Sequence, residues 1–256
     1  FKSNARENLG FTPSPPTSST ETRSVASQCA PATQQIDLDI NNVRAKILNG
    51  GDMWWDIFNT GTARYQVPKP ASSTTIGPSS QFASSVWVGG YDAGGQLKEA
   101  AQTYRQTGND YWPGPLRADA TTDATRCLQW DKFCKINRAD VQSYFDWAIN
   151  GEQGPNPLSG SITQPNPMDQ INSWPAFGPE GQPIAPYYDA NNDGVYDPTA
   201  ADVPDFYLGL AGTNPCNSQL YGDQCIYWVF NDRGNIHSET GGEPIGLEIQ
   251  AQAFAF

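Results

Sequence analysis

Histidine is almost absent from the sequence, which has a single one, His237, among its 256 residues. The five cysteines include no C-x-x-C pair, and zinc sites are built from cysteine and histidine at such spacings, so a zinc centre is not expected. The catalytic patterns G-x-S-x-G and H-E-x-x-H are also missing, and a lone histidine in a polar turn is more often a hydrogen-bonding residue. An enzyme is therefore the less favoured interpretation, although the many acidic residues leave a glycosidase pair open.

Basic residues are scarce as well, because 15 lysines and arginines stand against 27 acidic residues, for a formal net charge of -12. A field of this sign repels phosphate backbones, so nucleic acid is not an expected partner. Long apolar runs are missing too: the longest clear one, residues 226–230, falls far short of the ~20 residues that span a bilayer. We expect no membrane span. Scarce lysine with abundant Asp, Asn, Ser and Thr suits an extracellular protein.

Glycine and proline are abundant, at 24 and 21 residues, and aromatic residues reach 12%, which is typical of a turn-rich β protein. Apolar and polar residues alternate over residues 36–40 and 43–47, which predicts two half-buried strands. Further strands are expected at 225–230, at 245–256 and, as the favoured interpretation of an ambiguous pattern, at 96–105. The sequence therefore predicts a mainly β protein, a sandwich-like antiparallel β domain with long irregular loops and one short helix.

The one helix is expected over residues 137–150, with Asn137 as its N-cap and Gly151 at its end. More than half of residues 12–35 are Ser, Thr or Pro. Such a segment buries too little apolar surface to offset the entropy lost on ordering. We predict that residues 1–35 form an extended arm or linker. Residues 36–256 form a single β-rich domain that we expect to continue beyond the given chain. A long irregular crossing over residues 151–186 is anchored by Ile171, Trp174 and Phe177.

The most specific motif is the run of oxygen-bearing residues that begins at Asp189. It places oxygen ligands at positions 1, 3, 5 and 9 of a loop, glycine at position 6 and a backbone carbonyl at position 7, which is the calcium pattern of EF-hand loops. Position 12 is Ala200 in place of the usual glutamate, so we expect Asp202 or Asp205 to supply the missing carboxylate. The predicted ligands are Asp189, Asn191, Asp193, the carbonyl of Val195, Asp197, Asp202 and Asp205. The alternative is a turn whose side chains bond their own backbone.

Two short-range disulfides are predicted from sequence proximity, Cys127–Cys134 and Cys216–Cys225, which would leave Cys29 free or paired outside this chain. Eight tryptophans invite a glycan-binding interpretation, since exposed tryptophan stacks on sugar rings. Those inside strand-like runs are expected to be packing residues: Trp54, Trp55, Trp87 and Trp228. Trp112 and Trp174, each followed by proline, are the candidates for exposure.

Several segments resemble an N-terminal region of large secreted proteins of the Bacteroidota that carry a type IX secretion sorting domain at their far C-terminus. These segments are residues 38–56, 86–98, 101–116, 229–240 and 245–249. The resemblance implies export across the outer membrane, attachment to or release from the cell surface, and membership of a long multidomain chain. It transfers no catalytic residue.

Taken together, these observations predict a structural or adhesive module of a secreted, cell-surface assembly that holds a structural calcium ion. Its expected partners are other chains or domains of that assembly, which the arm would contact, and surface glycans. The alternatives are a secreted polysaccharide hydrolase and a glycan-binding module. A cleft with two nearby carboxylates would favour the hydrolase, and an exposed flat tryptophan pair the glycan-binding module.

Overall fold

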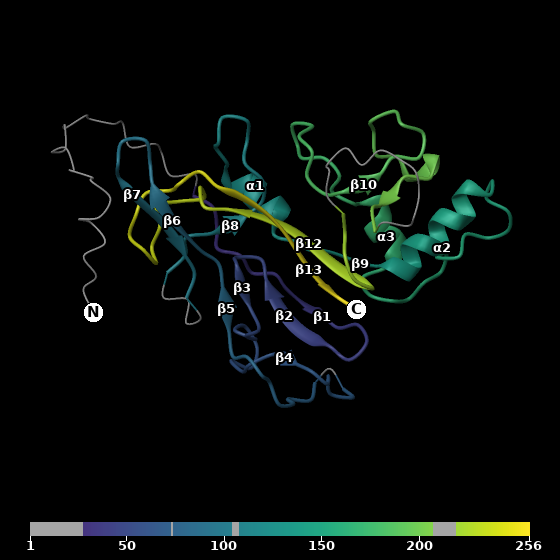
Figure 1. Ribbon diagram of the computed structural model, residues 1–256, viewed down its shortest axis with the longest axis horizontal. Coiled ribbons are helices and arrows are strands. Elements are labelled where there is room, and N and C mark those ends of the chain that lie inside the picture. Colours follow the sequence, from purple (N-terminus) through teal and green to yellow (C-terminus); the bar gives the residue numbers. More distant parts are fainter. Residues whose placement is uncertain (1–27, 73, 104–107, 207–218) are drawn as a thin grey trace, which may run out of the picture.

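One strand, β12 (Gln224–Asn231), is buried along its whole length and organises the fold. In the computed structural model, which describes residues 28–256 except 73, 104–107 and 207–218, it lies between antiparallel neighbours on both sides. On one side it pairs over eight residues with β13 (Glu248–Ala255). On the other side it pairs first with β9 (Cys134–Asn137) and then with β8 (Trp112–Pro113). These four strands form the central sheet (Figure 1).

A second antiparallel sheet covers one face of the central sheet (Figure 1). Ile226, Trp228 and Phe230 of β12 pack against this second sheet in one hydrophobic core, as the strand period of two requires. The arrangement is sandwich-like. The second sheet consists of β1 (Gln35–Leu38), β2 (Arg44–Leu48), β3 (Asp52–Met53), β5 (Ser84–Ser85) and β4 (Tyr65–Gln66), which pairs with β2.

The opposite face of the central sheet is covered by helices and irregular chain (Figure 1). Here Cys225, Tyr227 and Val229 of β12 enter a separate core. The covering elements are α2 (Arg138–Ile149), α3 (Pro167–Asn172), the small sheet of β10 (Tyr187–Tyr188) and β11 (Val203–Pro204), and the 3₁₀-helix η1 (Pro198–Ala200). Elsewhere lie α1 (Ala124–Trp130) and a hairpin of β6 (Trp87–Tyr91) and β7 (Leu97–Ala101).

The mainly β, antiparallel fold is confirmed, and so are the helix over residues 137–150 and the strand within 96–105. The expectation of a single helix is wrong, because α1 and α3 are helical too. Both are too short for a periodic pattern, yet both have a side-chain cap: Asp123 accepts from Arg126 N, and Asn166 accepts from Met168 N. Ile171 and Trp174 anchor the long crossing as predicted.

The second predicted strand, β2, is not half-buried but buried on both faces. Its charged face pairs with Asp37 of β1, whose carboxylate lies 2.9 Å from Arg44 Nε and 2.8 Å from Lys46 Nζ. Burial alone would raise the pKa of Asp37, but the hydrogen bonds and charges of Lys46 and Arg44 outweigh it and lower the pKa. A buried charge pair of this kind is costly to break, because the remaining partner is left without compensation.

Replacing Asp37 with Asn should lower the free energy of unfolding at pH 7 by about 3 kcal/mol, because Arg44 and Lys46 lose their counter-charge. A group whose pKa is lowered by folding stabilises the fold at pH values above its pKa in the unfolded state. This stabilisation is lost as the pH falls through the pKa of the folded state. Wild type should therefore lose more stability than the variant below about pH 4. Urea unfolding from pH 7 to pH 2 measures both, and parallel curves would contradict the prediction.

The predicted Cys127–Cys134 disulfide is wrong, and the predicted Cys216–Cys225 pair includes a residue outside the described part of the chain. Cys29 and Cys127 form the disulfide, across 98 residues, beside the buried ring of Trp112. Cys134 and Cys225 are free and buried in the core under α2, while Cys216 lies outside the described residues. Burial raises the pKa of the Cys134 thiol to about 11 and that of Cys225 to about 12, so both are unreactive. The disulfide fixes the segment before β1, and Asp131 holds that segment too, accepting from Thr33 N and Oγ1.

Removing this disulfide should destabilise the fold by about 5 kcal/mol on the chain-entropy estimate for a loop of this length. The double variant Cys29→Ala/Cys127→Ala should melt at a lower temperature than wild type. A reductant should lower the melting temperature of wild type and leave that of the variant unchanged, which serves as the control. Equal melting temperatures of wild type with and without reductant would show that the bridge contributes nothing.

Candidate metal centre and ligand-binding surfaces

The predicted calcium loop connects β10 to η1 and β11. Its tight course depends on two residues with left-handed backbone, Asn192 at φ 60° and Gly194 at φ +77°. Glycine adopts such angles without steric cost and asparagine is the next most tolerant residue. The turn that the sequence assigned to Gly194 is therefore present.

The first three predicted ligands close this turn with their own oxygen atoms. The buried carboxylate of Asp189 accepts from Gly194 N at 2.8 Å and from Asp193 N at 3.3 Å. Asn191 Oδ1 accepts from Asp193 N at 3.1 Å, and Asp193 Oδ1 accepts from Val195 N at 2.8 Å. These are the side-chain-to-backbone bonds of the alternative interpretation, and they fold the loop by themselves.

Asp202 joins the two ends of the loop. Its Oδ1 accepts from Ala190 N and its Oδ2 from Asp197 N, both at 2.8 Å. Burial raises the pKa of Asp202, and the nearby charges of Asp189 and Asp193 raise it further, so the three carboxylates lie within electrostatic reach of one another.

The two remaining predicted carboxylate ligands, Asp197 and Asp205, are less well placed to bind a metal ion. Asp197 Oδ1 accepts from the backbone and hydroxyl of Thr199, which caps η1. Asp205 is buried below the loop, and its backbone bonds to Pro186 and Leu220. In the described part of the chain, no group of three or more His, Cys, Asp or Glu side chains is gathered closely enough to hold a metal. The donor set fits calcium in kind, but its carboxylates are not assembled into a shell.

The single histidine has a structural role in the interior of the protein. The His237 side chain is fully buried, with Nδ1 2.7 Å from the carbonyl oxygen of Glu99 and Nε2 2.9 Å from that of Asp232. Carboxylate oxygens of Asp110 and Asp232 lie 3.7 Å from Nδ1 and 3.6 Å from Nε2.

The tryptophans are distributed differently from the sequence prediction. Trp112 and Trp174, the candidates for exposure, are buried. Trp87, expected to be a packing residue, is 69% exposed. The strand assignment around Trp87 was right, but β6 belongs to a two-stranded hairpin that leaves it exposed, which periodicity alone does not reveal.

The hairpin presents an apolar face. Trp87 and Tyr91 are four residues apart on β6, and Tyr91 pairs with Leu97 of β7, so the strand period places all three on one face. Tyr91 is 64% and Leu97 54% exposed. The Trp87 indole is held by its Nε1, which donates to Gln102 O at 2.9 Å and to Ser85 Oγ at 3.0 Å. We call Trp87, Tyr91 and Leu97 the aromatic face.

A hollow of about 340 Å³ adjoins Trp87, with Ala100, Ala101 and the carboxyl residue Glu99 among its lining. Figure 1 shows the hairpin at one end of the molecule, with α2 at the other. The aromatic face is therefore a surface set apart from the helical layer.

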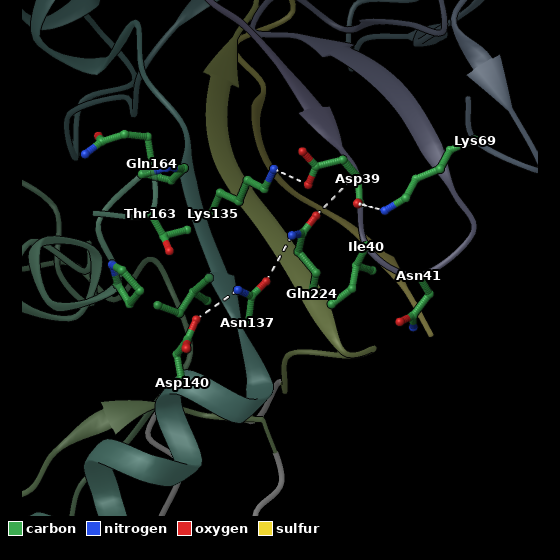
Figure 2. A pocket seen from close by; sticks show the side chains of 13 residues that line it. Asp39, Ile40, Asn41, Lys69, Lys135, Asn137, Asp140, Thr163, Gln164 and Gln224 are labelled. Carbon is green, nitrogen blue, oxygen red and sulfur yellow. Dashed lines mark hydrogen bonds and ion pairs between the residues drawn. The ribbon is translucent and has the colours of Figure 1, made fainter. Parts of the chain in front are cut away.

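A second hollow, of about 300 Å³, lies where the β1–β2 turn approaches β9 and the start of α2 (Figure 2). Sequence patterning gave no signal for this polar pocket, because its lining comes from segments that are far apart along the chain. The polar residues of the lining are Asp39, Asn41, Lys69, Lys135, Asn137, Asp140, Thr163, Gln164 and Gln224.

Comparison with family models, with curated proteins and with solved structures found no match to this chain. Among the described helices, none is long and apolar enough to cross a membrane.

Proposed function

We propose that this chain is a structural or adhesive module of a secreted, cell-surface assembly. The observation that supports it best is the aromatic face, on which three large apolar side chains are each more than half exposed on one side of a hairpin. Grouped, exposed apolar side chains of this size mark contact surfaces, and tyrosine and tryptophan are among the side chains most enriched there.

The fixed orientation of Trp87 adds to this argument. Its indole nitrogen is bonded to Gln102 and Ser85, so the exposed ring loses little freedom when a partner packs on it. Side chains ordered before binding contribute more of their contact energy to affinity. The partner that the proposal assigns to this face is another chain or domain of the same assembly.

Secretion is part of the proposal. The Cys29–Cys127 disulfide fits an oxidising compartment, and the resemblance to secreted Bacteroidota proteins suggests the type IX route. A polysaccharide hydrolase is the alternative function. The described chain offers no observation that favours it over an adhesive role.

A structural calcium ion in the loop of Asp189 is the second part of the proposal. The ligand types suit calcium, and Gly194 has the backbone conformation that the motif requires. The loop is already closed by hydrogen bonds, so calcium would add stability by binding the native state and would not be needed for folding.

Calcium at a concentration 100 times its dissociation constant should raise the free energy of unfolding by about 2.7 kcal/mol, and a chelator should reverse the effect. Asp189→Asn should weaken this response, because it removes the negative charge of the ligand at position 1. Glu243→Gln, at an exposed position, is the control and should respond like wild type. Thermal melts with calcium, magnesium and chelator measure the effect. An unchanged melting temperature in wild type would rule out the calcium site.

The aromatic face is tested with Trp87→Ser/Leu97→Ser in the producing cell. The variant should keep its melting temperature, since both side chains are mostly exposed, but should be lost from the cell-surface fraction to the medium. Ile162→Ser, at a position 93% exposed, is the matched control and should stay with the surface fraction. Retention of the double variant, or release of reducing sugar from polysaccharide by the wild-type protein, would contradict the adhesive role.

A further inference from the structure

The walls of the polar pocket are fixed by a chain of hydrogen bonds between amide and carboxylate groups (Figure 2). Gln224 Oε1 accepts from Asp39 N at 2.9 Å, and Gln224 Nε2 donates to Asn137 Oδ1 at 2.9 Å. Asn137 Nδ2 in turn donates to Asp140 Oδ2 at 2.8 Å. Gln224 is only 4% exposed and sits directly opposite Asn137 in the central sheet. Each group is therefore oriented before any ligand arrives.

The positive charges of the pocket are compensated by the protein itself. Lys135 Nζ lies 2.5 Å from Asp39 Oδ1 and 2.8 Å from the carbonyl oxygen of Asp37. Lys69 Nζ donates to the carbonyl oxygen of Asp39 at 2.6 Å. The negative charges of Asp39 and Asp140 equal in number the positive charges of the two lysines, so the lining carries no net charge. An anionic ligand would meet two carboxylates, and the lysines are already engaged, so the pocket favours neither an anion nor a zwitterion.

What the pocket offers is a dense set of neutral and charged donors and acceptors beside small apolar surfaces. Carboxylates accept, ammonium groups donate, and the amides of Gln164 and Asn41 and the hydroxyl of Thr163 do both. The apolar part of the lining is Ile40, Ile136, Pro165 and Pro167. A ligand that matches this lining carries many hydroxyl groups, which both donate and accept, on a ring whose C–H groups contact proline and isoleucine.

We propose that the polar pocket binds a neutral saccharide unit. Its volume of about 300 Å³ is at the lower end of the range of ligand pockets, which suits one or two sugar rings. A ligand without hydroxyl groups would form fewer hydrogen bonds with this lining. This inference rests on the proposed adhesive role and names the class of ligand that the module recognises at a surface separate from the aromatic face.

Titration calorimetry with neutral di- and trisaccharides of glucose, mannose, galactose and N-acetylglucosamine tests the assignment on the purified chain. At least one series should bind to wild type. Asp140→Asn and Gln164→Ala should each weaken that binding at least tenfold, because the first replaces a carboxylate acceptor by a neutral amide and the second removes an amide from the lining. Asp146→Asn and Gln142→Ala are matched controls: they make the same substitutions on α2 outside the lining, and should bind like wild type.

The proposal is overturned if wild type binds none of these saccharides. It is also overturned if Asp140→Asn and Asp146→Asn bind saccharide with equal affinity. Binding of free amino acids or inorganic phosphate in place of saccharides overturns it as well. The aromatic face and the polar pocket are tested by different variants, so either proposal can fail without the other. Trp87→Ser/Leu97→Ser should bind saccharide like wild type, so loss of surface retention in that variant with intact saccharide binding concerns the aromatic face alone. Saccharide binding weakened as much by Trp87→Ser/Leu97→Ser as by Asp140→Asn would contradict the polar pocket.

Discussion

The strand β12 supplies both hydrophobic cores at once, and every other layer is placed by it. Its odd-numbered residues from Cys225 to Val229 enter the core beneath the helices, and its even-numbered residues from Ile226 to Phe230 enter the core shared with the second sheet. Its backbone pairs with three other strands, β8, β9 and β13. A strand buried on both faces cannot shift its register by one residue without exchanging the contents of the two cores. This constraint fixes the sandwich and the helical layer relative to each other.

Much of the remaining chain is irregular, and buried aspartates organise it. Asp232 accepts hydrogen bonds from the backbone amides of Ile245, Gly246 and Leu247, and Asp110 accepts from Ala101, Glu239 and Thr240. His237 ties these two centres together. Asp202 does the same for the loop after β10. Buried loop amides need partners, and a carboxylate can accept several at once. Part of the acidic composition that suggested metal and extracellular partners therefore serves the fold itself.

Features that depend on local pattern could be predicted from the sequence, and features that depend on tertiary contact could not. Alternation located β1 and β2, a short apolar run located the strand around Ile226, and apolar spacing with a cap located α2. The Cys29–Cys127 pairing joins residues whose proximity exists only after folding, so nearness in sequence was misleading. Trp87 illustrates the same limit, since a strand pattern does not say whether another layer covers the strand. The calcium loop is intermediate: its turn follows from Gly194, while the position of Asp197 depends on the cap of η1.

The two proposed binding surfaces differ in what holds them. The polar pocket shares its wall with the central sheet, because Asn137 and Gln224 are partners in the β9–β12 register and also line the hollow. This wall is therefore held by the sheet, which suits recognition of a small ligand by hydrogen bonds. The aromatic face stands on a hairpin that, within the described chain, pairs only with itself. A contact made by large apolar side chains tolerates small displacements better than a hydrogen-bonded site does, because dispersion and burial are less directional. The two proposals therefore assign the more directional chemistry to the more rigid element, and the contact with another chain to the separate hairpin.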